Sequence, residues 1–382
     1  MDARAKALIS TGVNIVNLTA GEPDFDTPAD ARRGGLSAIE QGFTHYTAVA
    51  GIPELRSAIA TKLRADNGLG YEPAQIVVSN GAKQSIYNAL MVLLDPGDEV
   101  IIPIPSWVSY PEMVGLADGV PVLVDTRSTN FRLTAAAAEA AITPRTKAIV
   151  LNSPNNPTGV VYTDGELRAL AALAVEHDLQ VISDEIYEKL VYGAEFVSIA
   201  SLGEDILART VTVNGFSKAY AMTGWRMGYA AAPRELADAM ASLQSQCTSG
   251  ASSITQHAAL AALRGDQAPL EEMRVQFDRR RRFVAERLQG MPGIEVEFLP
   301  EGAFYIFPRI AALYGRRAIT GSVSFAERLL EEGRVALVPG LPFGSDDHVR
   351  LSYASSMEQL TEAMDRMEAF VRSLAEVDVI RG

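Results

Sequence analysis

Cysteine is almost absent from this sequence of 382 residues, which contains Cys247 alone and therefore cannot form an intrachain disulfide. No signature of a catalytic thiol surrounds Cys247, so we expect it to be a small buried residue. The four histidines are scattered and lack the spacing of metal ligands, so we predict no metal site.

Long apolar runs and clustered positive charge are also missing. No stretch approaches the roughly 18–20 apolar residues that span a bilayer, and residues 1–21 lack the apolar core of a secretory signal. The net charge of −13 argues against nucleic acids and anionic membranes as partners. The one basic run, Arg279–Arg282, lies in a helical pattern and is interpreted as a solvated helix face. We therefore expect a soluble cytoplasmic protein.

What the sequence does contain is a regular alternation of short β-branched runs and helical patterns between about Ile76 and Ala232. The runs are nearly continuous in apolar residues, which indicates strands buried on both faces and hence a mostly parallel sheet. The seven predicted strands are Ile76–Val78, Glu99–Pro103, Val120–Val124, Ala148–Leu151, Gln180–Ser183, Thr210–Val213 and Met227–Ala231. This part of the chain is predicted to be an α/β domain, with helices flanking the sheet.

The regular alternation of strand and helix patterns ends after about Asp266, where a long charged helix, Leu270–Gln289, is predicted. Shorter elements follow, which is typical of a smaller α+β domain. They are strands Ile294–Phe298, Phe304–Phe307, Val335–Val338 and Val349–Tyr353, helix Val323–Glu332 and a closing helix. We predict a large domain over residues 41–268, a small domain over 269–382, and an N-terminal segment, residues 1–40, that packs with the small domain.

Chemically versatile side chains follow the predicted strands at one edge of the sheet, where ligands of such folds bind. The stretch "TVTVNGFSKAYAMTGWRMGYAAAP" places Lys218 in a turn between two strands, with Arg226 eight residues beyond it. Asp184 ends another strand, and "SNGAKQ" opens directly into a helix whose free N–H groups favour an anion. Taken singly, each feature is more often an ordinary turn, cap or surface charge. Together they suit a planar phosphorylated cofactor that has a ring nitrogen and an aldehyde, such as pyridoxal 5′-phosphate.

These stretches also carry a family resemblance over essentially the whole chain. The sequence resembles the class I, fold-type I, pyridoxal-phosphate aminotransferases, close to the prokaryotic aspartate aminotransferases. The motifs are "LTAGEPDFDTP", "HYTAVAGIPELR", "NGAKQSIYNALMVLLDPGDEV", "PSWVSYPEM", "NSPNNPTG", "SDEIYE", "NGFSKAYAMTGWRMGY", "GAFYIF" and "HVRLSYA". They occur in the family's order and at suitable spacing.

The resemblance implies a role for each of these positions in holding the cofactor. Lys218 would form the Schiff base and move the proton, and Asp184 would hold the proton on the pyridine nitrogen. Asn156 and Tyr187 would bond the phenolic oxygen, and Trp107 would stack on the ring. The backbone around Gly81, Ala82 and Lys83 would hold the phosphate together with Arg226 and Ser217, and Tyr46 would reach the phosphate of a neighbouring subunit.

The resemblance also implies the substrates and the assembly. Arg350, assisted by Gly21, Trp107 and Asn156, would bind the α-carboxylate of an amino acid, and a 2-oxo acid would accept the amino group in a ping-pong reaction. Aspartate and 2-oxoglutarate are the first expectation, and Lys83 is our candidate for the distal carboxylate. A homodimer with shared active sites is implied.

Two departures and several alternatives stay open. Gly215 stands where the family often has a phosphate-binding serine, and the sequence begins near its first strand, whereas relatives commonly have a longer arm that braces the dimer. Prephenate, alanine or aromatic substrates, or a β-lyase reaction, would use the same lysine and aspartate. A nicotinamide-dependent dehydrogenase would need G-x-G-x-x-G, which is absent. A transcription regulator of this fold would need a basic domain, for which we expect no room before Gly21.

Overall fold

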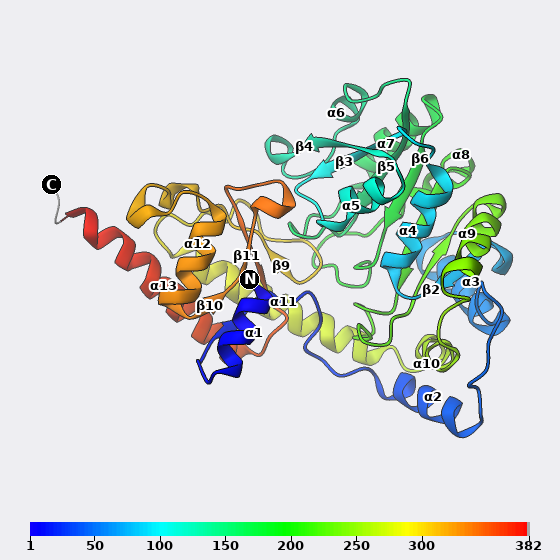
Figure 1. The fold of residues 1–382 in the computed structure, drawn as a ribbon, viewed down its shortest axis with the longest axis horizontal. Coiled ribbons are helices and arrows are strands. Elements are labelled where there is room, and N and C mark those ends of the chain that lie inside the picture. Colours follow the sequence, from blue (N-terminus) through cyan, green and yellow to red (C-terminus); the bar gives the residue numbers. More distant parts are fainter. Residues whose placement is uncertain (380–382) are drawn as a thin grey trace.

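A computed structural model describes residues 1–379 of the chain, with side chains through residue 374. The chain forms a large lobe around a seven-stranded sheet and a smaller lobe around short strands (Figure 1). The strands of the large sheet are β2 (Ile76–Ser79), β3 (Glu99–Ile104), β4 (Val120–Asp125), β5 (Thr146–Asn152), β6 (Gln180–Asp184), β7 (Thr210–Gly215) and β8 (Gly228–Ala231). All seven predicted strands are confirmed, with bounds that differ by no more than two residues.

The sheet is mostly parallel, in the order β2-β8-β7-β6-β5-β3-β4. Strand β8 alone runs against its neighbours β2 and β7. The parallel order brings the carboxyl ends of β3, β5, β6 and β7 to one edge. The prediction that every strand is buried on both faces is wrong for β4, where Val120 is 43% exposed and Leu123 is 50% exposed. Strand β4 lies at the edge of the sheet and pairs with β3 alone.

Helices cover both faces of the large sheet because successive strand residues point to opposite sides. Ile182 packs with Ile86 of α4 on one face, whereas its neighbour Val181 packs with Leu170 of α7 on the other. The helices of this lobe are α3 (Pro53–Asn67), α4 (Ala82–Leu93), α5 (Ser109–Leu116), α6 (Ala135–Glu139), α7 (Asp164–Glu176), α8 (Glu204–Leu207), α9 (Arg234–Cys247) and α10 (Ser253–Arg264).

The small lobe contains two short sheets. A parallel pair joins β1 (Val16–Asn17) to β10 (Val335–Ala336), and an antiparallel sheet has the order β11 (Val338–Pro339), β12 (Val349–Ser352) and β9 (Tyr305–Ile306). Helices α11 (Ala268–Gln289), α12 (Ser322–Arg328), which a π-turn continues, and α13 (Met357–Val379) pack around them.

Two strand predictions in the small lobe are wrong in detail. The segment Ile294–Phe298 is no strand and makes only a single bridge, from Glu295 to Arg309. The segment Val335–Val338 divides between two sheets, because β10 pairs with β1 and β11 pairs with β12. Apolar periodicity indicates that a segment is extended, but it does not say which partner the segment finds.

The N-terminal segment, residues 1–40, divides between the lobes. Helix α1 (Asp2–Ser10) and β1 pack with the small lobe. Helix α2 (Ala29–Glu40) instead lies against α10 of the large lobe, so closely that a Cβ on Gly34 would stand 2.5 Å from the Cβ of Ala261. The small residues on α2 therefore serve helix packing in the large lobe. The predicted boundaries near residues 40 and 268 stay a prediction.

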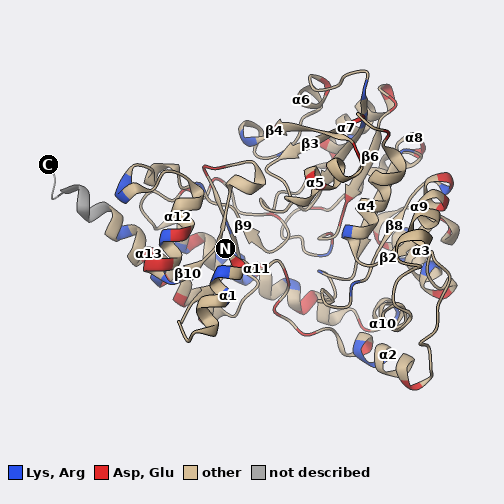
Figure 2. Cartoon of the chain, viewed as in Figure 1, with Lys and Arg blue, Asp and Glu red and all other residues tan. Residues whose placement is uncertain are grey.

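Two expectations about single residues are wrong. In the basic run, Arg280 and Arg281 are only 8% and 3% exposed, because Arg280 pairs with Asp24 and Arg281 donates to the carbonyl of Pro300. Cys247 is exposed at the end of α9. Helices α11 and α13 both carry basic and acidic residues (Figure 2). Among the described residues, no helix has the length and apolarity needed to cross a membrane.

Candidate active site

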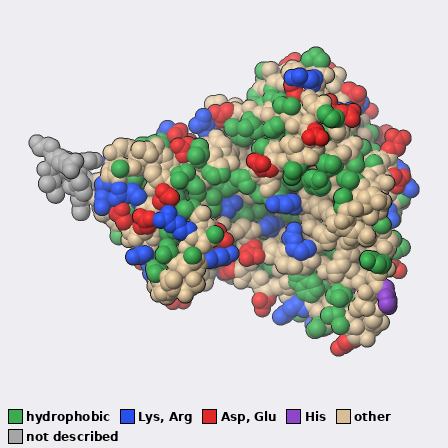
Figure 3. Space-filling view, in the orientation of Figure 1, with side chains coloured by type: hydrophobic (Ala, Val, Ile, Leu, Met, Phe, Trp, Pro, Cys, Tyr) green, Lys and Arg blue, Asp and Glu red, His purple; other side chains and the backbone are tan. Residues whose placement is uncertain are grey.

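A cavity of about 630 Å³ lies where the carboxyl ends of the large sheet's strands face the small lobe. Basic side chains gather in the hollow between the two lobes (Figure 3). Eleven of the predicted site residues line the cavity: Gly21, Ala82, Lys83, Trp107, Asn156, Asp184, Tyr187, Ser217, Lys218, Arg226 and Arg350. Segments that are far apart in the sequence thus contribute to a single space.

Two predicted residues lie outside the lining of this cavity. Gly81 sits directly behind it, because a Cβ at Gly81 would lie 2.5 Å from Nη2 of the lining residue Arg226. Tyr46 lies in a separate surface hollow and is 94% exposed. Its side chain therefore contributes nothing to the cavity of its own chain.

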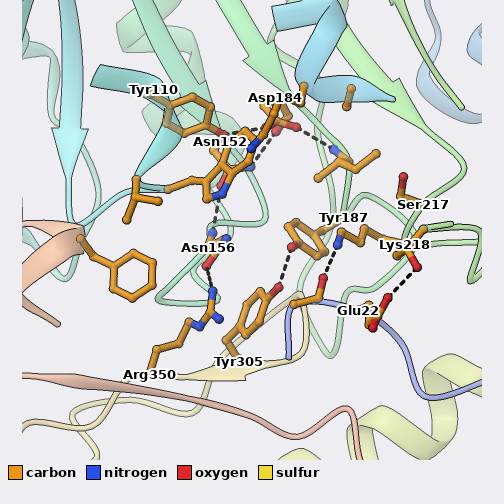
Figure 4. Close-up of a pocket in the computed structure, with 18 of the residues that line it drawn as sticks. Glu22, Tyr110, Asn152, Asn156, Asp184, Tyr187, Ser217, Lys218, Tyr305 and Arg350 are labelled. Atoms are coloured by element: carbon orange, nitrogen blue, oxygen red, sulfur yellow. Dashed lines mark hydrogen bonds between the residues drawn. The ribbon is translucent and has the colours of Figure 1, made fainter. Parts of the chain in front are cut away.

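Lys218 follows β7 in a tight turn, and its side chain enters the cavity (Figure 4). Its Nζ donates a hydrogen bond to the carbonyl of Gly21 and lies 5.8 Å from the ring centroid of Tyr187. Burial, and to a smaller extent the nearby charge of Arg350, lower the pKa of Lys218 to about 8. A substantial fraction of this amine is therefore neutral near physiological pH, which makes it a nucleophile and a base.

Asp184 ends β6 and is buried at the floor of the cavity. Burial raises the pKa of its carboxyl to about 6, although two hydrogen bonds oppose the rise. The Tyr110 hydroxyl donates to Oδ2 over 2.6 Å, and the Ile186 N–H donates to Oδ1 over 3.2 Å. The carboxylate is thus fixed in orientation and can pair with a cationic ring nitrogen.

Arg350 reaches the cavity from β12 of the small lobe. Its Nη1 donates to Oδ1 of Asn156 and its Nη2 to the carbonyl of Thr19, both over 2.9 Å. Its buried Nε has no partner among the described residues. A buried guanidinium with an unpaired donor at a cavity wall is suited to bind a carboxylate.

An anion cradle forms where β2 leads into α4. Gly81 has a positive φ of 85° and precedes the first residue of the helix, Ala82. A Cβ at Gly228 would lie 2.3 Å from the backbone nitrogen of Ala82, so only glycine permits β8 to approach the helix this closely. Arg226 stands beside the N-terminus of α4, because its Nη2 donates to the carbonyl of Asn80 over 3.4 Å. Backbone N–H groups and a guanidinium together favour a phosphate there.

Lys83, the next residue of α4, points toward another wall of the cavity. Its Nζ lies 4.7 Å from the ring centroid of Trp107, and both residues line the cavity. The cavity therefore contains a cation from the large lobe, Lys83, in addition to Arg350 from the small lobe.

Sequence reasoning missed several residues that line the cavity: Glu22, Tyr110, Asn152, Tyr305 and Phe343. Tyr110 and Tyr305 occur within the motifs "PSWVSYPEM" and "GAFYIF", but nothing in the sequence shows what their hydroxyls contact. In the structure, the hydroxyl of Tyr305 lies 2.9 Å from that of Tyr187. These contacts join segments more than 70 residues apart and emerge only from the fold.

Comparisons with known proteins agree on one family. The model of the family "Aminotransferase class I and II" matches residues 13–367. An aspartate aminotransferase of Geobacillus stearothermophilus is 48% identical, over 97% of this chain and 95% of its own. An aspartate/prephenate aminotransferase of Cereibacter sphaeroides is also 48% identical, with the same coverage. The structure of a Thermus thermophilus aspartate aminotransferase with maleate superimposes with a TM-score of 0.92 at 47% identity, covering 96% of this chain and 94% of the other.

Proposed function

The chain belongs to the class I and II aminotransferases, and we propose from this premise that it moves the amino group of L-aspartate to 2-oxoglutarate. As a member of this family it is a transaminase whose cofactor is pyridoxal 5′-phosphate. The observation that carries the substrate proposal is the pair of cations, Arg350 and Lys83, that line the same cavity as the amine of Lys218. A dicarboxylic amino acid is the substrate class that such a pair would select.

The residues of the cavity fit the cofactor. The cradle at Gly81 and Ala82, where an added Cβ at Gly81 or at Gly228 would clash, is suited to the phosphate together with Arg226. Asp184 offers a buried carboxylate for the ring nitrogen, and Trp107 offers an indole face for the ring. Because Gly215 lies against Gly228 with no room for a side chain, Ser217 supplies the hydroxyl of this segment to the cavity.

Bound pyridoxal phosphate supplies an aldehyde that takes up the amino group and a ring that accepts the electron pair left when Cα loses its proton. The chain supplies the rest. Arg350 would hold the substrate carboxylate so that the Cα–H bond faces Lys218. The Lys218 amine would remove this proton and deliver it to the cofactor's aldehyde carbon, while Asp184 stays ionised and keeps the ring nitrogen protonated.

Lys83 is proposed to bind the distal carboxylate of aspartate and glutamate. The names of the relatives support a dicarboxylate, and maleate, which the Thermus structure contains, is one. We expect Lys83→Ala to lower kcat/KM for aspartate by about 10- to 100-fold, the effect of losing a charged hydrogen bond. Activity with alanine, which has no distal carboxylate, should change little.

Steady-state kinetics with both donors tests the assignment of Lys83. Lys189→Ala is the matched control, because Lys189 pairs with Asp66 outside the cavity and should leave both donors unaffected. An unchanged kcat/KM for aspartate in Lys83→Ala would remove Lys83 from the substrate site.

Prephenate is a second candidate for the acceptor, because a relative of equal identity is named an aspartate/prephenate aminotransferase. It carries two carboxylates, so the same two cations would bind it. Amino transfer from aspartate or glutamate to prephenate, followed by mass spectrometry of the product, tests this candidate directly.

We also propose that the enzyme is a homodimer in which Tyr46 reaches the partner's phosphate site. Exposed apolar residues surround this region: Leu36 and Ile39 on α2, and Phe43 just beyond it. Such a patch beside an almost fully exposed tyrosine favours burial against a second copy. Sedimentation velocity should give a particle of twice the mass of one chain, whereas a monomer at micromolar concentration would contradict the proposal.

A further inference from the structure

Tyr305 on β9 touches two parts of the site at once (Figure 4). We propose that it is a positioning residue that links the hydrogen-bond donor for the cofactor, Tyr187, to the carboxylate clamp, Arg350. This inference rests on the proposed function and deepens it, because it assigns a role to a residue that makes neither of the two primary contacts.

The hydroxyl of Tyr305 provides the first contact, at 2.9 Å from the hydroxyl of Tyr187. Both residues are buried, so water does not compete for this hydrogen bond. If Tyr187 donates its proton to the phenolic oxygen of the cofactor, its own oxygen must accept from Tyr305, because a phenol has a single proton. Tyr305 then makes Tyr187 a stronger donor, since hydrogen bonds in a chain polarise one another.

The ring of Tyr305 provides the second contact. The guanidinium carbon of Arg350 lies 4.4 Å from its centroid, a cation–π distance. On β12 the neighbour of Arg350, Leu351, is in register with Ile306, and Ser352 is in register with Tyr305. The antiparallel pairing of β9 and β12 therefore fixes the tyrosine beside the arginine and aims its hydroxyl across to the large lobe.

Arg350 also lies over a second ring, that of Phe343, at 5.1 Å. Phe343 has no hydroxyl and can make no such bond to Tyr187. The chain therefore offers a matched control, a residue that shares the ring contact with Arg350 but lacks the link to the cofactor's partner.

The test measures the two contacts separately in the cofactor-loaded protein. The pH midpoint of the cofactor's visible absorption band reports on the phenolic oxygen, and titration calorimetry with succinate reports on the carboxylate clamp. Tyr305→Phe removes the hydrogen bond to Tyr187 but keeps the aromatic ring beside Arg350. Tyr187 then stabilises the anionic phenolic oxygen of the cofactor less well, so the pH midpoint should rise by about half a pH unit. Succinate binding at a pH far from the midpoint should stay within about twofold.

The other variants complete the pattern. Phe343→Leu should weaken succinate binding by about 3- to 10-fold without moving the pH midpoint. Tyr305→Leu should show both effects. An unmoved midpoint in Tyr305→Phe would overturn the link, as would an equal midpoint shift in Phe343→Leu. A wild-type protein with no cofactor band, or with no affinity for succinate, would instead contradict the proposed function itself.

Discussion

Lys218→Ala is expected to lower turnover by about 10⁴-fold or more while leaving the fold intact. The loss is large because one amine has two tasks, covalent attachment of the cofactor and transfer of the Cα proton. No other described lysine can replace it: Lys83, the other lysine that lines the cavity, lies over Trp107. Steady-state transamination of aspartate measures the loss, and circular dichroism verifies the fold.

A chemical readout distinguishes this role from a merely structural one. Borohydride reduction of the loaded wild-type protein should attach the cofactor irreversibly to the peptide that contains Lys218, and the alanine variant should release its cofactor on denaturation. Lys189→Ala, whose lysine pairs with Asp66 outside the cavity, should retain full turnover. Near-normal transamination by Lys218→Ala would refute the assignment.

Asp184→Asn is expected to lower kcat/KM by about 10³-fold, because an amide cannot keep a proton on the ring nitrogen. The substitution preserves size and leaves an oxygen to accept from Tyr110, so the floor of the cavity should stay in place. The measurement is again transamination of aspartate, with cofactor content determined for each preparation. Activity within tenfold of wild type would show that this carboxylate does not support the ring.

Tyr110→Phe is a milder variant than Asp184→Asn, because it changes the pKa of the Asp184 carboxyl without removing the carboxyl. The Tyr110 hydroxyl lowers the pKa of Asp184, so its removal should raise this pKa above about 6 in the cofactor-free protein. A carboxylate with a raised pKa loses its charge at higher pH as the solution is acidified. Affinity for pyridoxal phosphate should therefore begin to fall at a higher pH in the variant than in wild type, with little difference at pH 8.

The strands of the large sheet could be predicted because each of them is a short run of apolar or β-branched residues that is visible in the local sequence. A buried parallel strand needs apolar residues on both faces, and a run such as Ala148–Leu151 meets this need within four residues. The segment Ile294–Phe298 was wrongly predicted to be a strand, because strand pairing depends on distant partners. For the same reason, the sequence did not show that residues 29–40 pack against α10. Arg280 and Arg281 look like surface charge until Asp24 and Pro300 are folded against them.

The residues of the cavity that could be predicted from the sequence are those that belong to recognisable motifs. Lys218, Asp184 and Arg226 follow strands in patterns whose chemistry is recognisable, and the fold brings them to one space. The hydroxyls of Tyr110 and Tyr305 were out of reach because a tyrosine's hydrogen-bond partner is set by tertiary packing. Tyr46 lies outside the cavity of its own chain, and its proposed role requires a second subunit.

The central claim, a dicarboxylate aminotransferase, is tested most directly by a single half-reaction. The cofactor-loaded protein is mixed without any acceptor with aspartate, glutamate, alanine or phenylalanine, and the cofactor's visible absorption band is followed. We predict that aspartate and glutamate convert the band to that of the aminated cofactor at least about tenfold faster than the other two donors. Equal or faster conversion by alanine or phenylalanine would contradict the dicarboxylate assignment, and no conversion by any donor would contradict amino transfer itself.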